Sequence, residues 1–141
     1  MIKNLTWLAL IISLPTSNAP ARMRIWRALK SAGCGVLRDG VYLLPDSEAA
    51  AFSLEQQATA AIEAGGTAQI VKLCGTHSSQ DTSFCKLFER TDDYAALKQE
   101  IDAFLGTMPI QNLIASTRAL KRIARDFASV SAIDFFPGPA R

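Results

Sequence analysis

Residues 20–45 read Pro-Ala-Arg-Met-Arg-Ile-Trp-Arg-Ala-Leu-Lys-Ser-Ala-Gly-Cys-Gly-Val-Leu-Arg-Asp-Gly-Val-Tyr-Leu-Leu-Pro, and this stretch decides the fold. Pro20 suits the first turn of a helix, and Gly33 suits the left-handed residue that ends one. The segment between them is long enough for about three turns. Residues Val41–Leu44 have the composition of a strand. The stretch therefore predicts a helix that runs into a strand.

The predicted helix has an apolar face and a basic face. At about 100° per residue, Ile25, Leu29 and two alanines share one side, and Trp26 lies at its margin. Arg22 falls on the apolar side, so its side chain must reach solvent or meet an acidic partner. No acidic residue occurs between residues 22 and 38, where the basic residues are Arg22, Arg24, Arg27, Lys30 and Arg38.

The residues before this helix allow two interpretations. Lys3, the apolar run Leu5–Leu14 and the small residues at 19–21 are typical of a secretory signal peptide. The alternative is a central strand over Thr6–Ser13 that is buried on both faces. The apolar run is far shorter than the roughly 20 residues of a transmembrane helix. We therefore expect no membrane-spanning segment here.

The residues after the helix continue an alternation of strands and helices. Cys34–Leu44 is predicted to be extended, and its Arg-Asp-Gly centre indicates either a bulge or a tight turn. A residue after Pro45 can cap a second helix, which the pair Gly65-Gly66 ends. Thr67–Cys74 then has the pattern of a strand. The order strand, helix, strand, helix, strand assigns residues 1–75 to one α/β part.

From residue 76 the pattern becomes helical. A polar loop at Gly75–Asp81 is followed by a short helix around Phe84–Phe88 and a second helix over Tyr94–Phe104. A third helix begins near Pro109 and has the clearest amphipathic pattern in the chain. Its basic face consists of Arg118, Lys121, Arg122 and Arg125.

The C-terminal end of the sequence suggests a boundary. Ala132–Phe136 has the composition of a short strand, and Pro137-Gly138-Pro139 reads as a linker. We expect residues 76–136 to pack on the α/β part as one domain. Residues 137–141 would lead to a second domain that this chain does not contain.

Composition favours one globular domain with its charge segregated along the chain. The 141 residues are 49% hydrophobic and 20% charged, with a net charge of +2. No lysine or arginine occurs between Asp39 and Val71. The odd count of three cysteines fits a reducing compartment better than a disulfide framework.

Motifs for catalysis are missing from the sequence. It contains no nucleophile elbow, P-loop, dinucleotide fingerprint or His-Glu-x-x-His motif. Cys74, His77 and Cys85 could offer soft metal ligands, with Cys34 as a fourth, but their spacing matches no common zinc module. Buried thiols and a loop histidine explain these residues equally well. We expect no enzymatic activity, no cofactor and no metal.

The two basic helical faces are the stronger functional signal. Basic side chains gathered on a helix can neutralise phosphates and release counterions, which gives salt-dependent binding to nucleic acid. The alternative is that each face is simply solvated. Neither face has evident base-reading residues, so contact with phosphates is better supported than sequence recognition.

Several long motifs resemble one family. Trp7–Pro15, Ala21–Lys30 and Leu37–Pro45 closely resemble the amino-terminal domain of ChrB chromate-resistance regulators, and Asp93–Leu97 and Ala132–Gly138 are similar to it as well. The resemblance implies a bacterial, cytoplasmic protein that represses a chromate-efflux operon until chromate arrives. It also implies an α+β fold, a ferredoxin-like plait with additional C-terminal helices, because the first half of the family is similar to PaaX-type repressors and CRISPR adaptation nucleases. This favours a strand at the N-terminus over a signal peptide.

Two departures limit what the resemblance implies. The nuclease relatives carry a metal-binding acidic residue near the end of the first strand, where this chain has Ser13 and Leu14. We therefore expect no nuclease activity. Typical ChrB proteins continue into a second domain, to which chromate sensing is attributed, whereas this chain ends at Arg141.

The leading hypothesis is a DNA-binding, homodimeric regulatory domain that occupies the operator of a chromate-efflux operon. Two alternatives remain: a protein-interaction scaffold that never touches DNA, and a direct binder of oxyanions, which guanidinium groups suit. The residues expected to contact phosphate or anion are Arg22, Arg24, Arg27, Lys30, Arg38, Arg118, Lys121, Arg122 and Arg125.

Overall fold

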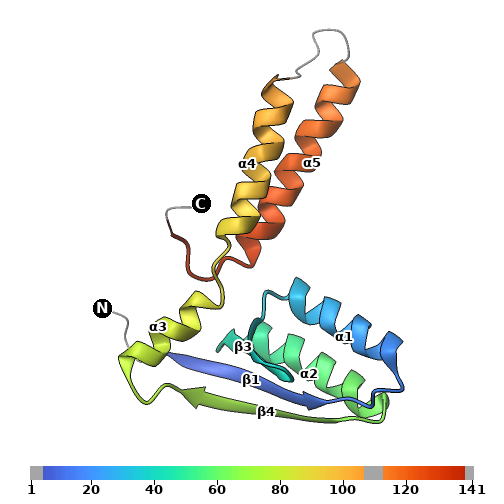
Figure 1. The fold of residues 1–141 in the computed structure, drawn as a ribbon, viewed down its shortest axis with the longest axis vertical. Coiled ribbons are helices and arrows are strands. Elements are labelled where there is room, and N and C mark those ends of the chain that lie inside the picture. The colour runs from blue at the N-terminus through green and yellow to red at the C-terminus, as the bar shows by residue number, and fades with distance from the viewer. Residues whose placement is uncertain (1–4, 107–112, 139–141) are drawn as a thin grey trace. The chain divides into compact units, whose positions relative to one another are not determined.

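The computed structural model describes residues 5–106 and 113–138 and divides into two compact units, Met1–Phe88 and Glu89–Arg141. Among the described residues, the first unit holds four strands and three helices, and the second holds two helices (Figure 1). The predicted α+β class is confirmed. The expectation that residues 76–136 pack on residues 1–75 as one domain stays a prediction.

The first unit is built on one antiparallel sheet. Its strands are β1 (Thr6–Ser13), β2 (Gly35–Arg38), β3 (Val41–Pro45) and β4 (Thr67–Cys74), in the order β2-β3-β1-β4. Two helices, α1 (Ala19–Ser31) and α2 (Glu48–Glu63), lie on the same side of this sheet (Figure 1). The third helix, α3, spans Ser78–Lys86.

Strand β1 is the centre of the core. Trp7, Leu8, Ala9 and Leu10 are all buried, so both faces of the strand are covered over these residues. This confirms the strand interpretation of residues 6–13. On one face Trp7 stacks on Phe88, with ring centroids 5.6 Å apart.

The ends of α1 and α2 follow the predicted capping rules. Asn18 caps α1 by accepting a hydrogen bond from the amide of Ala21, and Gly33 follows the helix with a φ of 82°. Ser47 caps α2 by accepting a 3.0 Å hydrogen bond from the amide of Ala50. These local interactions explain why the sequence located both helices.

The segment Cys34–Leu44, which was predicted to be extended, forms a hairpin of two strands. Both features that the sequence allowed are present: Asp39 and Gly40 form a tight turn, and the register shifts between Val36 and Arg38. Gly40 has a φ of 81°, which permits the turn, and its carbonyl accepts a 2.9 Å hydrogen bond from the amide of Ile12. The sheet therefore has four strands, one more than expected.

The predicted polar loop at Gly75–Asp81 is wrong in its second half, because α3 already begins at Ser78. Asp81 lies in the first turn of α3 and is 1% exposed. Its carboxylate accepts hydrogen bonds from the indole of Trp7 in β1 and from the amide of Leu5 just before β1, so tertiary contacts stabilise this helical turn.

The second unit is a pair of helices, α4 (Thr91–Gly106) and α5 (Leu113–Ala132), which run antiparallel side by side (Figure 1). Tyr94 and Leu97 of α4 and Ile123 of α5 are buried. The predicted helix start near Pro109 lies outside the described residues. None of the helices that the structure describes is long and apolar enough to cross a membrane.

The predicted strand at Ala132–Phe136 is wrong. Ala132 ends α5, and the following residues are irregular. Asp134 is held by the hydroxyl of Tyr94, which donates a 2.7 Å hydrogen bond to its carboxylate. Strand-forming composition does not make a strand here, because no neighbouring strand occurs among the described residues of this unit.

Candidate functional site

The basic face of α5 is the most concentrated positive surface that the structure describes. Arg118, Lys121, Arg122 and Arg125 are all exposed and line one shallow pocket of about 630 Å³. The first and the last are seven positions apart, which corresponds to about 10 Å along the helix. Among the described residues, no carboxylate forms an ion pair with any of these four side chains.

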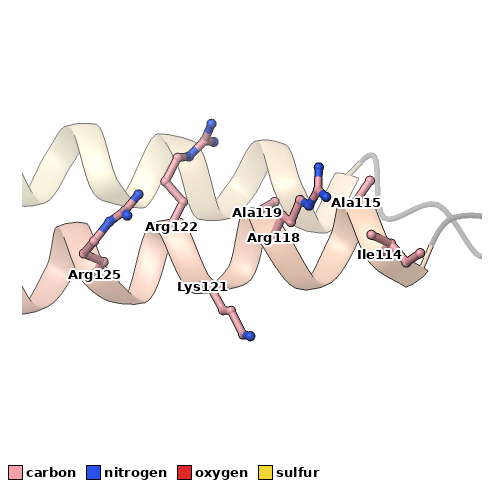
Figure 2. Close-up of a pocket in the computed structure, with 7 residues that line it drawn as sticks. All are labelled: Ile114, Ala115, Arg118, Ala119, Lys121, Arg122 and Arg125. Carbon is pink, nitrogen blue, oxygen red and sulfur yellow. The ribbon is translucent and has the colours of Figure 1, made fainter.

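The four side chains are not equivalent. Figure 2 shows Arg118, Arg122 and Arg125 extending to the same side of α5, while Lys121 projects away from them. Three guanidinium groups on one side offer several planar donors to a phosphate or another oxyanion. Two small apolar residues, Ala115 and Ala119, also line the pocket. The arrangement can therefore bind an extended anion along the helix.

The basic residues of α1 are spread more widely around their helix. Ala21, Ile25 and Leu29 are buried, whereas Arg24, Arg27 and Lys30 are exposed and lie on the sides turned away from them. The structure thus places these three cations on solvent, but over a broader arc than the cations of α5.

Arg22 and Arg38 lie apart from these three cations. The exposed side chain of Arg22 lines a groove near the start of α1, and Arg38 is exposed at the end of β2. Arg22 therefore reaches solvent, as one of its two predicted outcomes required, and no ion pair joins it to a described carboxylate.

The groove beside Arg22 was missed by sequence reasoning. It has a volume of about 770 Å³ and lies where the end of β1, the first turns of α1 and the β2–β3 turn converge. Its polar lining includes Ser13, Asp39 and Tyr42, and Trp26 contributes an aromatic wall. Its pieces are distant in sequence, so only the fold brings them together.

The pKa of Tyr42, which lines the groove, is raised above its ordinary value. Burial raises the pKa of its hydroxyl, the nearby Asp39 carboxylate and Cys34 raise it further, and the Arg22 guanidinium opposes them. The phenol therefore remains a neutral hydrogen-bond donor at neutral pH.

The cysteines and the histidine do not form a cluster. His77 and Cys74 are exposed, whereas Cys34 and Cys85 are partly buried and form no disulfide. Within residues 5–106 and 113–138, no group of three or more His, Cys, Asp or Glu side chains could hold a metal ion. Burial raises the pKa of the Cys85 thiol, and the adjacent Asp81 carboxylate adds to this effect.

Two comparisons with known proteins point to the same family. A family model described as "Protein ChrB, N-terminal" matches residues 22–133. A curated relative, "Protein ChrB" of Cupriavidus metallidurans, is 34% identical over 134 residues, which cover 95% of this chain. These residues cover 41% of the relative, so the chain spans less than half of that protein's length. No solved structure matches the chain.

Proposed function

The chain belongs to the family of ChrB amino-terminal domains, and from this premise we propose that it is the DNA-binding part of a regulator of chromate resistance. In this role it occupies the operator of a chromate-efflux operon in the bacterial cytoplasm as a homodimer and acts as a repressor. The mechanism is binding alone, without a catalytic step, a cofactor or a metal. A second domain of the whole regulator binds the oxyanion and thereby weakens operator binding.

The observation that carries this proposal is the basic face of α5. Three arginines extend to one side of the helix, a lysine flanks them, and no described carboxylate neutralises them. Unpaired surface cations gain most from contact with a polyanion, because each phosphate that they neutralise releases condensed counterions. An anionic backbone lying along about two turns of α5 fits this spacing.

The cations of the first unit would extend the contact. Arg24, Arg27 and Lys30 of α1 are exposed, and an arginine stands at the end of β2. These side chains suit phosphates rather than base edges, because their arc is broad and they belong to different elements. They would position the protein on DNA without selecting its sequence.

The fold of the first unit is consistent with this assignment. Its elements follow the order β1-α1-β2-β3-α2-β4, and its strands are arranged β2-β3-β1-β4. We propose that this unit is a ferredoxin-like plait of the kind that PaaX-type repressors are expected to share.

Fluorescence anisotropy with DNA from the promoter of an adjacent efflux gene tests the proposal. We expect binding that weakens steeply as salt rises. The double variant Arg122→Gln/Arg125→Gln should reduce the salt slope by about 2, since each phosphate contact contributes about 0.9. The matched control Lys86→Gln/Lys98→Gln removes two exposed cations outside both basic faces and should leave the slope unchanged. No binding at low salt would refute the proposed role for this chain.

A protein-interaction scaffold is the second candidate, and the second unit supplies the observation that favours it. Leu105, Leu113, Ile114 and Leu120 on α4 and α5 are each more than half exposed. Apolar surface of this extent commonly marks a protein contact. Charge reversal at Arg24, Arg27 and Arg118 separates the two candidates, because a scaffold would retain both its assembly and its regulation.

Direct binding of an oxyanion is the third candidate, since the arginines of α5 could hold chromate without DNA. Isothermal titration of the chain with chromate measures this directly. Heat release that Arg122→Gln/Arg125→Gln abolishes would support it, and the absence of heat at high protein concentration would exclude it.

A further inference from the structure

The two edges of the sheet in the first unit differ sharply. Edge strand β2 has four residues, carries Arg38 and is interrupted by a register shift. Edge strand β4 has eight residues and pairs with β1 without interruption from Thr67 to Cys74. Short, bulged and charged edges resist the addition of another strand, whereas long regular edges invite it. Of the two edge strands, only β2 is both short and bulged.

The hydrogen bonds of β1 show which groups of β4 point outward. The amide of Asp46 donates to the carbonyl of Thr6 at 3.1 Å, and the amide of Ile12 donates to Gly40. The amides and carbonyls of the even-numbered residues of β1 therefore bond to β3, and those of the odd-numbered residues bond to β4. Since Ala9 pairs with Val71, the odd-numbered residues of β4 bond to β1. The outward amides and carbonyls belong to Ala68, Ile70, Lys72 and Cys74, and no described strand occupies that side.

The side chains of β4 offer little protection against pairing. The strand contains no proline, and its one charged residue is Lys72. The ammonium of Lys72 lies 3.1 Å from the carboxylate of Asp46, which follows β3 on the far side of β1. The ion pair thus directs the ammonium of Lys72 toward β1 and away from the outer edge of β4. An edge lysine that could repel an incoming strand is neutralised within its own sheet.

We propose that the outer edge of β4 pairs antiparallel with β4 of a second copy of this chain. A two-fold axis perpendicular to the sheet satisfies the outward groups of both copies and joins two four-stranded sheets into one. In a register centred on Ile70 or Val71, residues whose amides and carbonyls point outward pair with one another. The two Lys72 side chains are then not directly opposite each other.

A second copy suits this edge better than a charged foreign strand. The strand is nearly neutral, so two identical strands meet without like-charge repulsion. Pairing would also bury apolar surface on the side of the sheet opposite α1 and α2. There Val71 and Ile11 are exposed by 38% and 42%, and the two-fold axis brings the Val71 side chains of both copies together. This surface is the one we assign to the proposed homodimer, and it does not depend on DNA binding.

Sedimentation velocity of the 141-residue chain over a concentration series tests the assignment. We expect a species of twice 15.2 kDa. Val71→Lys places like charges opposite each other or next to each other at the axis and should raise the dimer dissociation constant by about tenfold. The matched control Leu37→Lys adds the same charge to β2, where Leu37 is 43% exposed, and should leave the dimer intact.

Two further measurements do not rely on the lysine variant. Ala68→Pro removes an outward amide without touching the bonds to β1 and should also weaken the dimer. Hydrogen exchange of the unmodified chain should show slow exchange at the amides of Ile70 and Lys72 at high concentration. A monomer at every concentration, or a dimer in which these amides exchange rapidly and both variants remain dimeric, would overturn the proposal. Because the readout is mass and exchange, the result is separate from that of the DNA assay.

Discussion

The indole Nε1 of Trp7 donates a 3.2 Å hydrogen bond to Oδ1 of Asp81, which joins the central strand β1 to helix α3. Both residues are essentially inaccessible to solvent. The other carboxylate oxygen of Asp81 accepts from the amide of Leu5 at 3.4 Å. One buried carboxylate therefore connects the start of β1 to the first turn of α3.

Replacing Asp81 by alanine should destabilise the first unit. The substitution removes the acceptor for the Trp7 indole and for a backbone amide, at a cost of about 1–3 kcal/mol per buried donor. Urea unfolding followed by tryptophan fluorescence measures the change. Asp81→Asn retains an acceptor oxygen and serves as the control with a smaller loss. Equal stability of Asp81→Ala and the unmodified chain would contradict the structural role.

Replacing Gly40 by alanine should destabilise the β2–β3 hairpin. Gly40 has a φ of 81°, and a Cβ there would lie 2.7 Å from the carbonyl oxygen of Ile12. The left-handed conformation alone costs a non-glycine residue roughly 1–2 kcal/mol. Thermal unfolding should show a lower Tm. The control Gly106→Ala meets no atom within 4 Å and should leave the Tm unchanged or raise it.

The stability of the first unit should fall in alkaline solution through Tyr42. Burial and then Asp39 raise the pKa of Tyr42 in the folded state, so the unfolded chain loses this proton first. The stabilising contribution is complete below the ordinary tyrosine range and is lost as pH rises through the folded-state pKa. Ultraviolet absorbance titration should show a lower Tyr42 pKa in Asp39→Asn and a higher one in Arg22→Gln. Titration of Tyr42 unchanged in both variants would argue against this electrostatic arrangement.

The thiols should react in a fixed order. Cys74 is exposed, whereas burial and the Asp81 carboxylate raise the pKa of Cys85 and reduce its thiolate fraction at a given pH. Alkylation followed by peptide mass spectrometry should therefore modify Cys74 before Cys85, and Asp81→Asn should narrow the difference. Preferential alkylation of Cys85 in the unmodified chain would count against the raised pKa.

The parts of the fold that were predicted correctly are local in origin. Pro20 and Gly33 mark the start and end of α1 because the preferences of the first helical turn and of left-handed termination involve residues within one turn. The burial of β1 was predictable because a strand that is apolar at successive positions needs cover on both faces. The basic face of α5 follows from helical periodicity alone.

The errors have a common cause in contacts between distant residues. The helical start of α3 depends on Asp81 reaching a tryptophan 74 residues earlier. The segment after α5 lacks a strand because the described part of its unit offers none to pair with. The groove lined by Arg22, Asp39 and Tyr42 was missed for the same reason, since three separate elements build it.

The sequence by itself determined the helices, the central strand, the basic faces and the family. Periodicity, capping residues and long motifs depend only on residues that are close together in the chain. Only the tertiary structure decided which side chains share a surface: the carboxylate buried against Trp7, the ion pair that draws Lys72 toward Asp46, and the regular edge of β4. The physical reason is that these contacts join residues distant in the sequence, and local patterns do not specify which distant residues meet.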